Sequence, residues 1–278
     1  MDSALFIVAT PIGNIDDVSY RCKRTLQEVD IIAAEDTRRA GKLLKLLNIE
    51  KKRLISYYDE VEKERTETLI KTMLEEGVTV ALISDAGTPG ISDPGYRLVA
   101  AAKQSGIPVH PVPGPSALTA LVSASGLPNH RILFVGFPPT KSHALDKEIE
   151  SWRNVNASVV FYESPRRLAK TLSKIQMYYP RADICIGREL TKLHEEIFSG
   201  DITTALEWSQ NQIMKGEAVI MVSPNHEEKT LTLQDIHHQL VRYLKEGKHF
   251  KDITAIYKDS GISKSDLYKY LIHLKEDL

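Results

Sequence analysis

The segment from Ser84 to Gly95 has the composition of a ligand-binding loop, with three glycines and two prolines among polar residues. It follows the apolar run from Val78 to Ile83 and precedes an alanine-rich stretch, so we expect it to leave the carboxyl end of a strand and enter a helix. Open α/β sheets bind ligands at that end, and glycines let the backbone approach them closely. The alternative is a strand-to-helix turn that binds nothing.

This loop matches neither of the common phosphate-binding patterns. It has no Gly-Lys-Ser/Thr and no Gly-x-Gly-x-x-Gly spacing, and the first strand ends in Thr10-Pro11-Ile12-Gly13-Asn14 with a single glycine. Glu35 falls where a Rossmann fold would hold a ribose, but without the glycines this coincidence is weak. A nicotinamide oxidoreductase is therefore disfavoured.

A second turn, from Pro111 to Ser116, also joins a strand to a helix and contains three prolines. The free amides at the start of that helix are suited to a carboxylate or a ring nitrogen. Ser116 is also suited to a simple capping role, and the sequence leaves both roles open.

Acidic and basic side chains meet at two further strand ends. Glu35-Asp36-Thr37-Arg38-Arg39 and Tyr162-Glu163-Ser164-Pro165-Arg166-Arg167 each place arginines at a helix start. Arginine binds phosphates through two hydrogen bonds, which suits a polyanion, whereas an exposed ion-pair network is the alternative. Because a cation opposes the helix dipole there, we expect an external anion or an internal carboxylate partner.

The elements that position these loops alternate along the first part of the chain. Short apolar runs occur at residues 5–9, 31–34, 54–56, 78–83 and 109–112, and the clearest helix is 64–76, with Gly77 at its end. This order predicts an α/β fold whose first domain, 1–126, has a parallel sheet covered on both faces.

A second α/β domain is expected over 127–224. Its apolar runs are 133–137, 159–162, 183–187, 196–199 and 218–222. Consecutive runs before and after Ser199-Gly200-Asp201 predict antiparallel pairing there, so the sheet should be mixed.

A helical tail is expected over 225–278. Its periodicity fits three short helices, and Ser263 in the turn 260–263 is available as the N-cap of the last. The turn resembles a helix-turn-helix connection, but nine basic and nine acidic residues balance from Glu227 onward. A packing or RNA-docking appendage is therefore favoured over a DNA-reading module.

Composition excludes several classes of protein. Hydrophobic residues make up 42% and charged residues 26% of the 278 residues, no apolar run is long enough to span a bilayer, and the first residues are not basic. A cytoplasmic protein without a membrane partner is expected.

Cys22 and Cys185 show no metal-binding spacing and are expected to be packing residues. Residues 21–53 carry ten Lys or Arg against five Asp or Glu, which suits phosphates or simply a solvated helical face.

Six motifs taken together resemble the tetrapyrrole methylase superfamily. They are Ala9–Asn14, Glu35–Arg38, Ser84–Gly95, Val112–Ser116, Tyr162–Arg167 and Gly187–Thr191, in order within residues 5–223. The resemblance is to the branch that methylates the ribose 2′-hydroxyl of a cytidine in 16S ribosomal RNA. It implies two α/β domains of the class III methyltransferase type, S-adenosylmethionine folded between them, a homodimer, and the small ribosomal subunit as substrate.

The resemblance also implies roles for individual residues. The cofactor contacts would be Pro11, Asp85, Gly87, Thr88, Gly90, Pro115, Ser116, Tyr162, Leu190 and Glu217. A sulfonium methyl is already activated, so no metal is required and the protein mainly aligns the attacking oxygen. A base should accept the proton of the ribose hydroxyl, and the candidates are Glu35, Asp36, Glu163 and Glu189. The candidates for RNA phosphates are Arg38, Arg39, Arg166 and Arg167.

Two alternatives remain at this point. A tetrapyrrole C-methyltransferase of the corrin or sirohaem type would keep the fold, but the paired arginine motifs and the helical tail argue against it. A non-enzymatic RNA-binding protein would leave both glycine- and proline-rich turns without a purpose.

Overall fold

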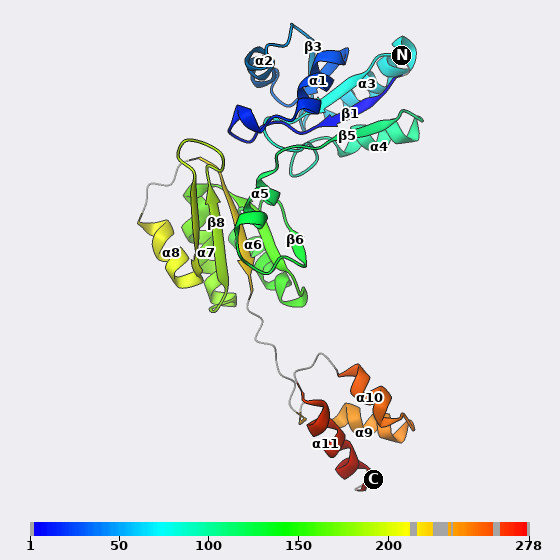
Figure 1. Cartoon of the computed structure of the whole chain (residues 1–278), viewed down its shortest axis with the longest axis vertical. Coiled ribbons are helices and arrows are strands. Elements are labelled where there is room, and N and C mark those ends of the chain that lie inside the picture. Colours follow the sequence, from blue (N-terminus) through cyan, green and yellow to red (C-terminus); the bar gives the residue numbers. More distant parts are fainter. Residues whose placement is uncertain (1–2, 212–215, 225–232, 235, 258–261, 277–278) are drawn as a thin grey trace. The chain divides into compact units, whose positions relative to one another are not determined.

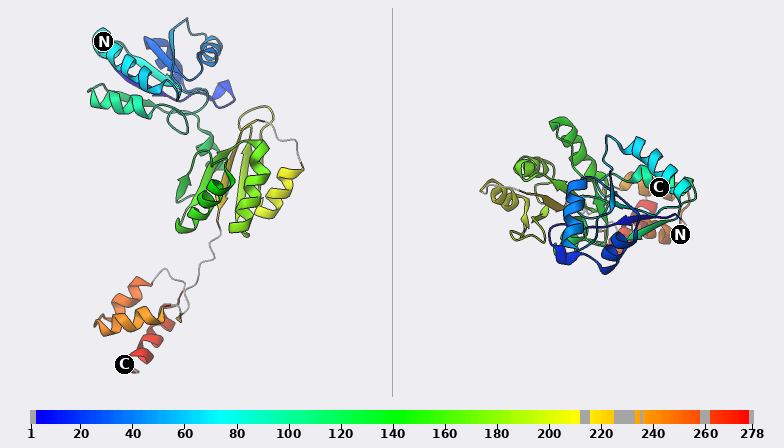
Figure 2. Two further views of the ribbon diagram at one scale, coloured as in Figure 1. Left: turned by 180° about the vertical axis from the view of Figure 1, so that it is seen from behind. Right: turned by 90° about the horizontal axis from the view of Figure 1, so that it is seen from above.

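The structure is a computed structural model of the 278-residue chain and describes residues 3–211, 216–224, 233–234, 236–257 and 262–276. It comprises two compact units, Met1–Pro224 and Asn225–Leu278. The first unit contains two five-stranded sheets, and the described part of the second is helical (Figures 1 and 2). The predicted fold class, two α/β domains with a small C-terminal helical appendage, is confirmed.

The first sheet is entirely parallel, with strand order β3-β2-β4-β1-β5. Its strands are β1 (Leu5–Val8), β2 (Ile31–Ala34), β3 (Arg53–Ser56), β4 (Val80–Ile83) and β5 (Val109–Val112). Every residue of β2 and β4 is buried because helices cover both faces, as the continuous apolar runs predicted.

Two helices cover each face of this sheet (Figure 1). The helices α1 (Tyr20–Glu28) and α2 (Thr37–Leu46) pack with Ile32 and Ile83 on one face, whereas α3 (Glu62–Glu76) and α4 (Tyr96–Gln104) pack with Leu82 on the other. Alternate residues of a strand point to opposite faces, so each central strand contributes to both cores.

The second sheet is mixed, with order β6-β7-β10-β8-β9. Its strands are β6 (Ile132–Phe134), β7 (Ser158–Glu163), β8 (Asp183–Arg188), β9 (Glu196–Asp201) and β10 (Ala218–Ser223). The pair β6–β7 is parallel and the other pairs are antiparallel.

The prediction of antiparallel pairing across Ser199-Gly200-Asp201 is wrong. The antiparallel partner of β9 is β8, which precedes it, and Asp201 ends the strand. Its carboxylate accepts hydrogen bonds from the N–H groups of Thr203 and Thr204, at 2.8 and 3.0 Å, and so caps helix α8 (Ile202–Gln210).

Four helices enclose the second sheet. The helices α6 (Ser142–Ser151), α7 (Pro165–Tyr178) and α8 cover one face, and α5 (Ala117–Ala124) covers the other, where Leu121 packs on Val219 and Met221. The predicted boundary at residue 126 assigns α5 to the first domain. The apolar face of α5 nevertheless packs on the second sheet, so the chain passes from one sheet to the other before this helix.

The second unit contains α9 (His237–Lys245), α10 (Phe250–Ile256) and α11 (Lys264–Glu276), the three helices that the periodicity predicted. Leu240, Ile253 and Leu271 form the centre of a separate core. Ser263 Oγ accepts a hydrogen bond from the N–H of Asp266 at 3.0 Å, as expected of an N-cap. Residues 260–261 of the predicted turn lie outside the described residues.

Among the helices of the described ranges, none has the length and apolarity needed to cross a membrane.

Gly41 offers a test of the local energetics of α2. It lies in the helix interior, and a methyl group there would meet no atom within 4 Å. Glycine in a helix is less favourable than alanine by about 0.5–1 kcal/mol. We expect Gly41→Ala to raise the free energy of unfolding in urea by about that amount, whereas Ala40→Gly in the adjacent buried position should lower it. A destabilised Gly41→Ala variant would contradict the open environment of this position.

Candidate active site

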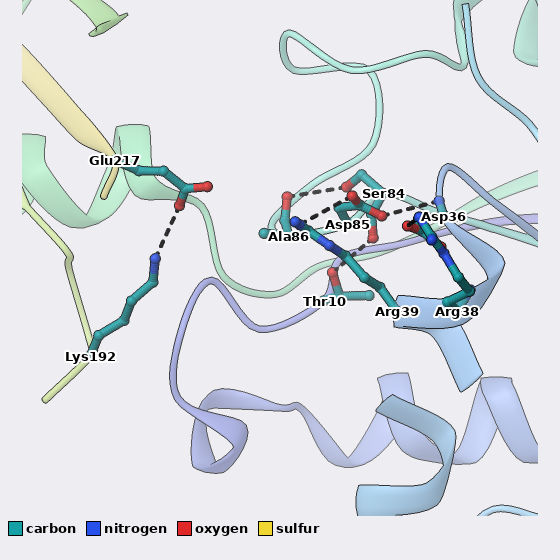
Figure 3. Close-up of polar contacts among 9 residues, drawn as sticks. All are labelled: Thr10, Asp36, Arg38, Arg39, Ser84, Asp85, Ala86, Lys192 and Glu217. Carbon is teal, nitrogen blue, oxygen red and sulfur yellow. Dashed lines mark hydrogen bonds and ion pairs between the residues drawn. The ribbon is translucent and has the colours of Figure 1, made fainter. Parts of the chain in front are cut away.

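Three loops meet at the carboxyl edge of the first sheet. Thr10, after β1, exchanges two backbone hydrogen bonds with Gly87 in the loop after β4, at 2.8 and 3.0 Å. The Asp36 N–H, after β2, donates to Asp85 Oδ1 at 3.1 Å, and Ser84 Oγ donates to the Ala86 carbonyl at 3.2 Å (Figure 3). The ends of three parallel strands are thus joined into one rim.

The glycine loop is also tied to the proline-rich turn. Thr88 donates its hydroxyl hydrogen to the Pro115 carbonyl at 3.1 Å. Gly87 has φ of +78°, and a Cβ there would lie 3.4 Å from Ile12 Cγ2. Glycine is favoured at this position because the left-handed backbone disfavours a side chain, whereas the contact with Ile12 is an ordinary van der Waals distance.

The second sheet contributes the loop after β8 and the residue before β10. Lys192 Nζ lies 2.9 Å from Glu189 Oε1 and 3.1 Å from Glu217 Oε2, and the latter contact is drawn in Figure 3. Glu189 and Thr191 have φ of +50° and +66°, a strained conformation that concentrates at functional sites. A side chain at Gly13 would collide with Lys192, so the loops of the two sheets touch here.

These loops line a cavity of about 520 Å³. Its volume lies within the range of about 300–1,000 Å³ that small-molecule sites occupy. The predicted site residues that line it are Glu35, Arg39, Asp85, Gly87, Thr88, Ser116, Tyr162, Glu163, Arg167, Glu189, Leu190 and Glu217. Tertiary structure therefore brings together strand ends that are far apart in the sequence.

The other predicted residues lie outside this cavity. Pro11 and Asp36 line a smaller neighbouring cavity of about 250 Å³, which shares Arg39 and Asp85 with the larger one. The residues that line neither cavity are Arg38, Gly90, Pro115 and Arg166. Pro115 contributes indirectly, through the carbonyl that accepts from Thr88.

Carboxylates form one wall of the larger cavity. Burial raises the pKa of Glu35, and the charge of Asp85 raises it further. Burial also raises the pKa of Asp93 to about 6; a hydrogen bond with Ser84 opposes this shift, and the charges of Glu35, Asp85 and Asp59 add to it. Mutual repulsion of partly buried carboxylates favours a cationic ligand.

Asp93 is a residue that the sequence analysis did not single out. It belongs to the Ser84–Gly95 loop, where Asp85 was selected instead, and both line the cavity. The composition of the loop gave no way to distinguish the two carboxylates, because the raised pKa of Asp93 depends on its burial and on the charges of Glu35 and Asp59 from other strand ends.

Glu163 and Arg167 are occupied by internal contacts. Glu163 is 2% exposed; its Oε1 accepts from the Ser164 N–H at 2.8 Å, and its Oε2 accepts from the Thr171 hydroxyl at 2.7 Å. Arg167 Nη2 lies 3.3 Å from Glu163 and donates to the Pro138 and Pro139 carbonyls. These contacts fix the start of α7 and disfavour the expected roles in proton transfer and RNA binding.

Asp36 and Glu189 are also poor bases. Hydrogen bonds from the Arg38 side chain and N–H hold the pKa of Asp36 well below its usual range. Burial alone would raise the pKa of Glu189, but hydrogen bonds from Lys192 and the Glu217 N–H lower it below the usual value. Carboxylates held in the charged form by fixed donors accept protons weakly.

The arginines at the helix starts have mostly internal partners. Arg38 pairs with Asp36 at 2.7 Å and is 87% exposed, and Arg39 Nη1 lies 3.1 Å from Asp85 with 62% of its side chain exposed. Arg166 is exposed at the start of α7. The sequence analysis expected either an external anion or an internal carboxylate beside these arginines. An internal carboxylate is present for Arg38, Arg39 and Arg167.

Ser116 does not act as a side-chain cap. It occupies the N-cap position of α5, but its hydroxyl makes no capping hydrogen bond. Burial raises the pKa of Tyr162, and hydrogen bonds with the Leu118 backbone and the Ser116 side chain oppose that shift. Phe137, whose ring centroid lies 5.5 Å from that of Tyr162, extends an aromatic wall at the cavity.

Metal ligation is not suggested by the arrangement. Within the described ranges, no group of three His, Cys, Asp or Glu side chains is placed to hold a metal ion.

Comparison with known proteins adds independent information. Residues 4–206 match the family described as Tetrapyrrole (Corrin/Porphyrin) Methylases. The Ribosomal RNA small subunit methyltransferase I of Halalkalibacterium halodurans is 38% identical over 273 residues, which cover 95% of this chain and 93% of that protein. The protein of the same name from Mesorhizobium japonicum is 41% identical, with 99% and 94% covered. That from Thermotoga maritima is 43% identical over 219 residues, 79% of this chain and 97% of that protein.

Solved structures show the same fold at low identity. The methyltransferase CobJ has a TM-score of 0.61 and 19% identity, covering 81% of this chain and 95% of its own. The uroporphyrin-III C-methyltransferase from Thermus thermophilus, in complex with S-adenosylhomocysteine, has a TM-score of 0.55 and 16% identity, covering 78% and 96%.

The raised pKa of Asp93 predicts that this carboxylate destabilises the protein at neutral pH. The folded pKa of about 6 exceeds the value of 3.8 usual for an aspartate, so the folded state binds the proton more tightly, and stability falls as pH rises between these values. We expect Asp93→Asn to be more stable than the wild type at about pH 7, and the difference to shrink at about pH 4. Urea unfolding at both pH values measures this, and an equal difference at both would contradict the shift.

Proposed function

The chain belongs to the tetrapyrrole (corrin/porphyrin) methylase family, and on this premise we propose that it is a methyltransferase that modifies ribosomal RNA with S-adenosylmethionine as donor. The observation that carries the proposal is the match over nearly the whole chain to proteins named for this activity. We further propose the ribose 2′-hydroxyl of a cytidine in 16S ribosomal RNA as the acceptor, on the strength of the motifs in residues 5–223.

The larger cavity fits S-adenosylmethionine in size and charge. This group supplies a methyl carbon activated by a positively charged sulfur. Asp85 would face that charge, and Gly87 would let the ligand approach the backbone because it has no side chain. The remaining contacts that we propose are Thr88, Ser116, Tyr162, Leu190 and Glu217.

A base must accept the proton of the ribose hydroxyl, and we assign this role to Asp93, with Glu35 beside it. Both carboxylates line the cavity, and burial raises the pKa of both above the usual values. A base with a pKa near the working pH combines a large ionised fraction with a useful affinity for the proton. Asp36 and Glu189 lack this combination because fixed donors hold their carboxylates. Both oxygens of the buried Glu163 are already engaged by Ser164 and Thr171.

Arg38, Arg39 and Arg166 are the arginines that we propose for RNA phosphates. The first two are held at the cavity edge by Asp36 and Asp85 and keep most of their surface exposed. Guanidinium groups fixed by a carboxylate lose less freedom when they bind a phosphate.

A tetrapyrrole substrate is less well supported. The structural relatives named for uroporphyrin III or precorrin methylation share 15–17% identity with this chain, which reflects the fold alone. A non-enzymatic RNA-binding protein would not need the cavity between the two sheets. The assembled small subunit as substrate, a homodimeric state and a cytoplasmic location are further parts of the proposal and rest on the resemblance.

Methyl transfer to unmodified small ribosomal subunits tests the function directly. With radiolabelled S-adenosylmethionine, we expect label at a cytidine whose 3′ linkage resists alkali, because a 2′-O-methyl group blocks attack by the neighbouring oxygen. Label elsewhere in the RNA would overturn the assigned acceptor. Cofactor binding without transfer to subunits or to naked RNA would favour a small-molecule substrate.

Asp93→Asn tests the assignment of the base. General bases contribute about 10²–10⁴-fold to rate, so we expect kcat to fall by about 10²-fold or more while the Kd of S-adenosylmethionine stays within a few-fold. In the wild type, kcat/KM should rise with pH through about 6 as Asp93 ionises. The exposed Asp252→Asn serves as the control. Unchanged kcat in Asp93→Asn would transfer the role to Glu35, for which Glu35→Gln is the corresponding variant.

A further inference from the structure

The smaller cavity is a second recessed site directly beside the first. It lies between the loop after β1, represented by Pro11 and Ile15, and helix α2, represented by Leu43 and Leu46. Arg39 and Asp85 line both cavities, so their ion pair of 3.1 Å stands at the border. A ligand that filled both would extend past this pair.

Charge on the surrounding surface is strongly one-sided. The helices α1 and α2, which pack on the same face of the first sheet, carry seven basic residues and one acidic residue, Glu28. The helices α3 and α4 on the opposite face carry five of each. The basic excess that the sequence showed over residues 21–53 is therefore concentrated on the face that contains the smaller cavity.

Exposed apolar side chains lie among these charges. Leu46, at the cavity, is 66% exposed and is flanked by the exposed Lys42 and Lys45, and Tyr20 at the start of α1 is 97% exposed. Basic side chains interleaved with apolar and aromatic ones are typical of surfaces that bind single-stranded nucleic acid, because phosphates and base faces are both contacted.

We propose that the α1–α2 face binds the ribosomal RNA strand and that the smaller cavity receives the base of a nucleotide next to the methylated one. This inference rests on the proposed function and adds the path of the substrate. With the acceptor ribose in the larger cavity, Arg39 at the border is placed for the phosphate between the two nucleotides.

The shape and lining of the smaller cavity favour a base over an independent ligand. Its volume of about 250 Å³ is below the range of about 300–1,000 Å³ of sites for whole small molecules. The apolar side chains of Ile15, Leu43 and Leu46 offer a surface for the flat face of a base. The carboxylate of Asp36 also lines it, at the sheet edge, and is partly exposed there, where the edge of a base requires partners.

Charge reversal tests the RNA path. We expect the double variant Lys42→Glu, Lys45→Glu to raise the Kd of a fluorescein-labelled oligocytidylate and the KM for small subunits by about tenfold or more. The slope of log Kd against log salt should fall by about 1.4, at about 0.7 per lost phosphate contact. The matched control is Lys63→Glu, Lys103→Glu on the opposite face, where both lysines are exposed.

Filling the cavity tests the position of the base. Leu46→Trp would cover the smaller cavity from an exposed position, so the fold should tolerate it. We expect a rise in the KM for subunits while the Kd of S-adenosylmethionine is unchanged. Leu74→Trp on α3 is the matched control, because Leu74 is 57% exposed on the opposite face. Thermal unfolding of both variants verifies the fold, and the lysine variants remain informative if Leu46→Trp unfolds.

The outcomes separate this inference from the proposed function. If the wild type methylates subunits and the α2 variants do so with the same KM, the RNA path is overturned and the function stands. Equal losses in the α2 variants and in their controls would also overturn it, because total charge or added bulk would then explain the effect. If the wild type transfers no methyl group to subunits or RNA, the proposed function itself fails.

Discussion

The pair of backbone hydrogen bonds between Thr10 and Gly87 is the interaction on which the site depends. Parallel strands end at a common edge, but the loops that follow them still need contacts to converge. This bridge joins the loops after β1 and β4, and the bond from Thr88 to Pro115 adds the loop after β5. Because buried backbone groups must be paired, the same bonds satisfy donors and acceptors that would otherwise require water. The loops that line the cavity are thus held together largely by hydrogen bonds to main-chain groups.

The carboxylates on that wall are arranged at a cost to stability. Glu35 and Asp93 are partly buried near Asp85. Within the described part of the chain, Arg39 is the cation that contacts these three carboxylates directly, through its ion pair with Asp85. Active sites commonly retain such repulsion because a bound ligand relieves it. A cationic ligand is therefore what this wall accommodates best, in agreement with the donor that the family uses.

The two sheets supply different parts of the site because their strands are connected differently. The parallel sheet presents the loops that follow its strands, whereas the mixed sheet supplies Lys192 and Glu189 from a strained turn and Glu217 from the position before β10. The helical unit has a core of its own around Leu240 and Leu271. The 219 aligned residues cover 97% of the relative from Thermotoga maritima. That protein therefore has no further segment as long as the helical unit Asn225–Leu278 of this chain. The residues that line the two cavities all belong to the unit Met1–Pro224.

The sequence by itself determined the elements, because the periods of strands and helices are local patterns. It predicted a parallel first sheet, a mixed second sheet, the three tail helices, and ligand-binding loops at the carboxyl ends of strands. It did not determine that Asp201 would cap a helix, that α5 would pack on the second sheet, or that Glu163 would be held by Thr171 and Arg167. Only the tertiary structure decided which carboxylates are free and partly buried, as with Asp93, because burial and hydrogen bonding depend on neighbours far away in the chain.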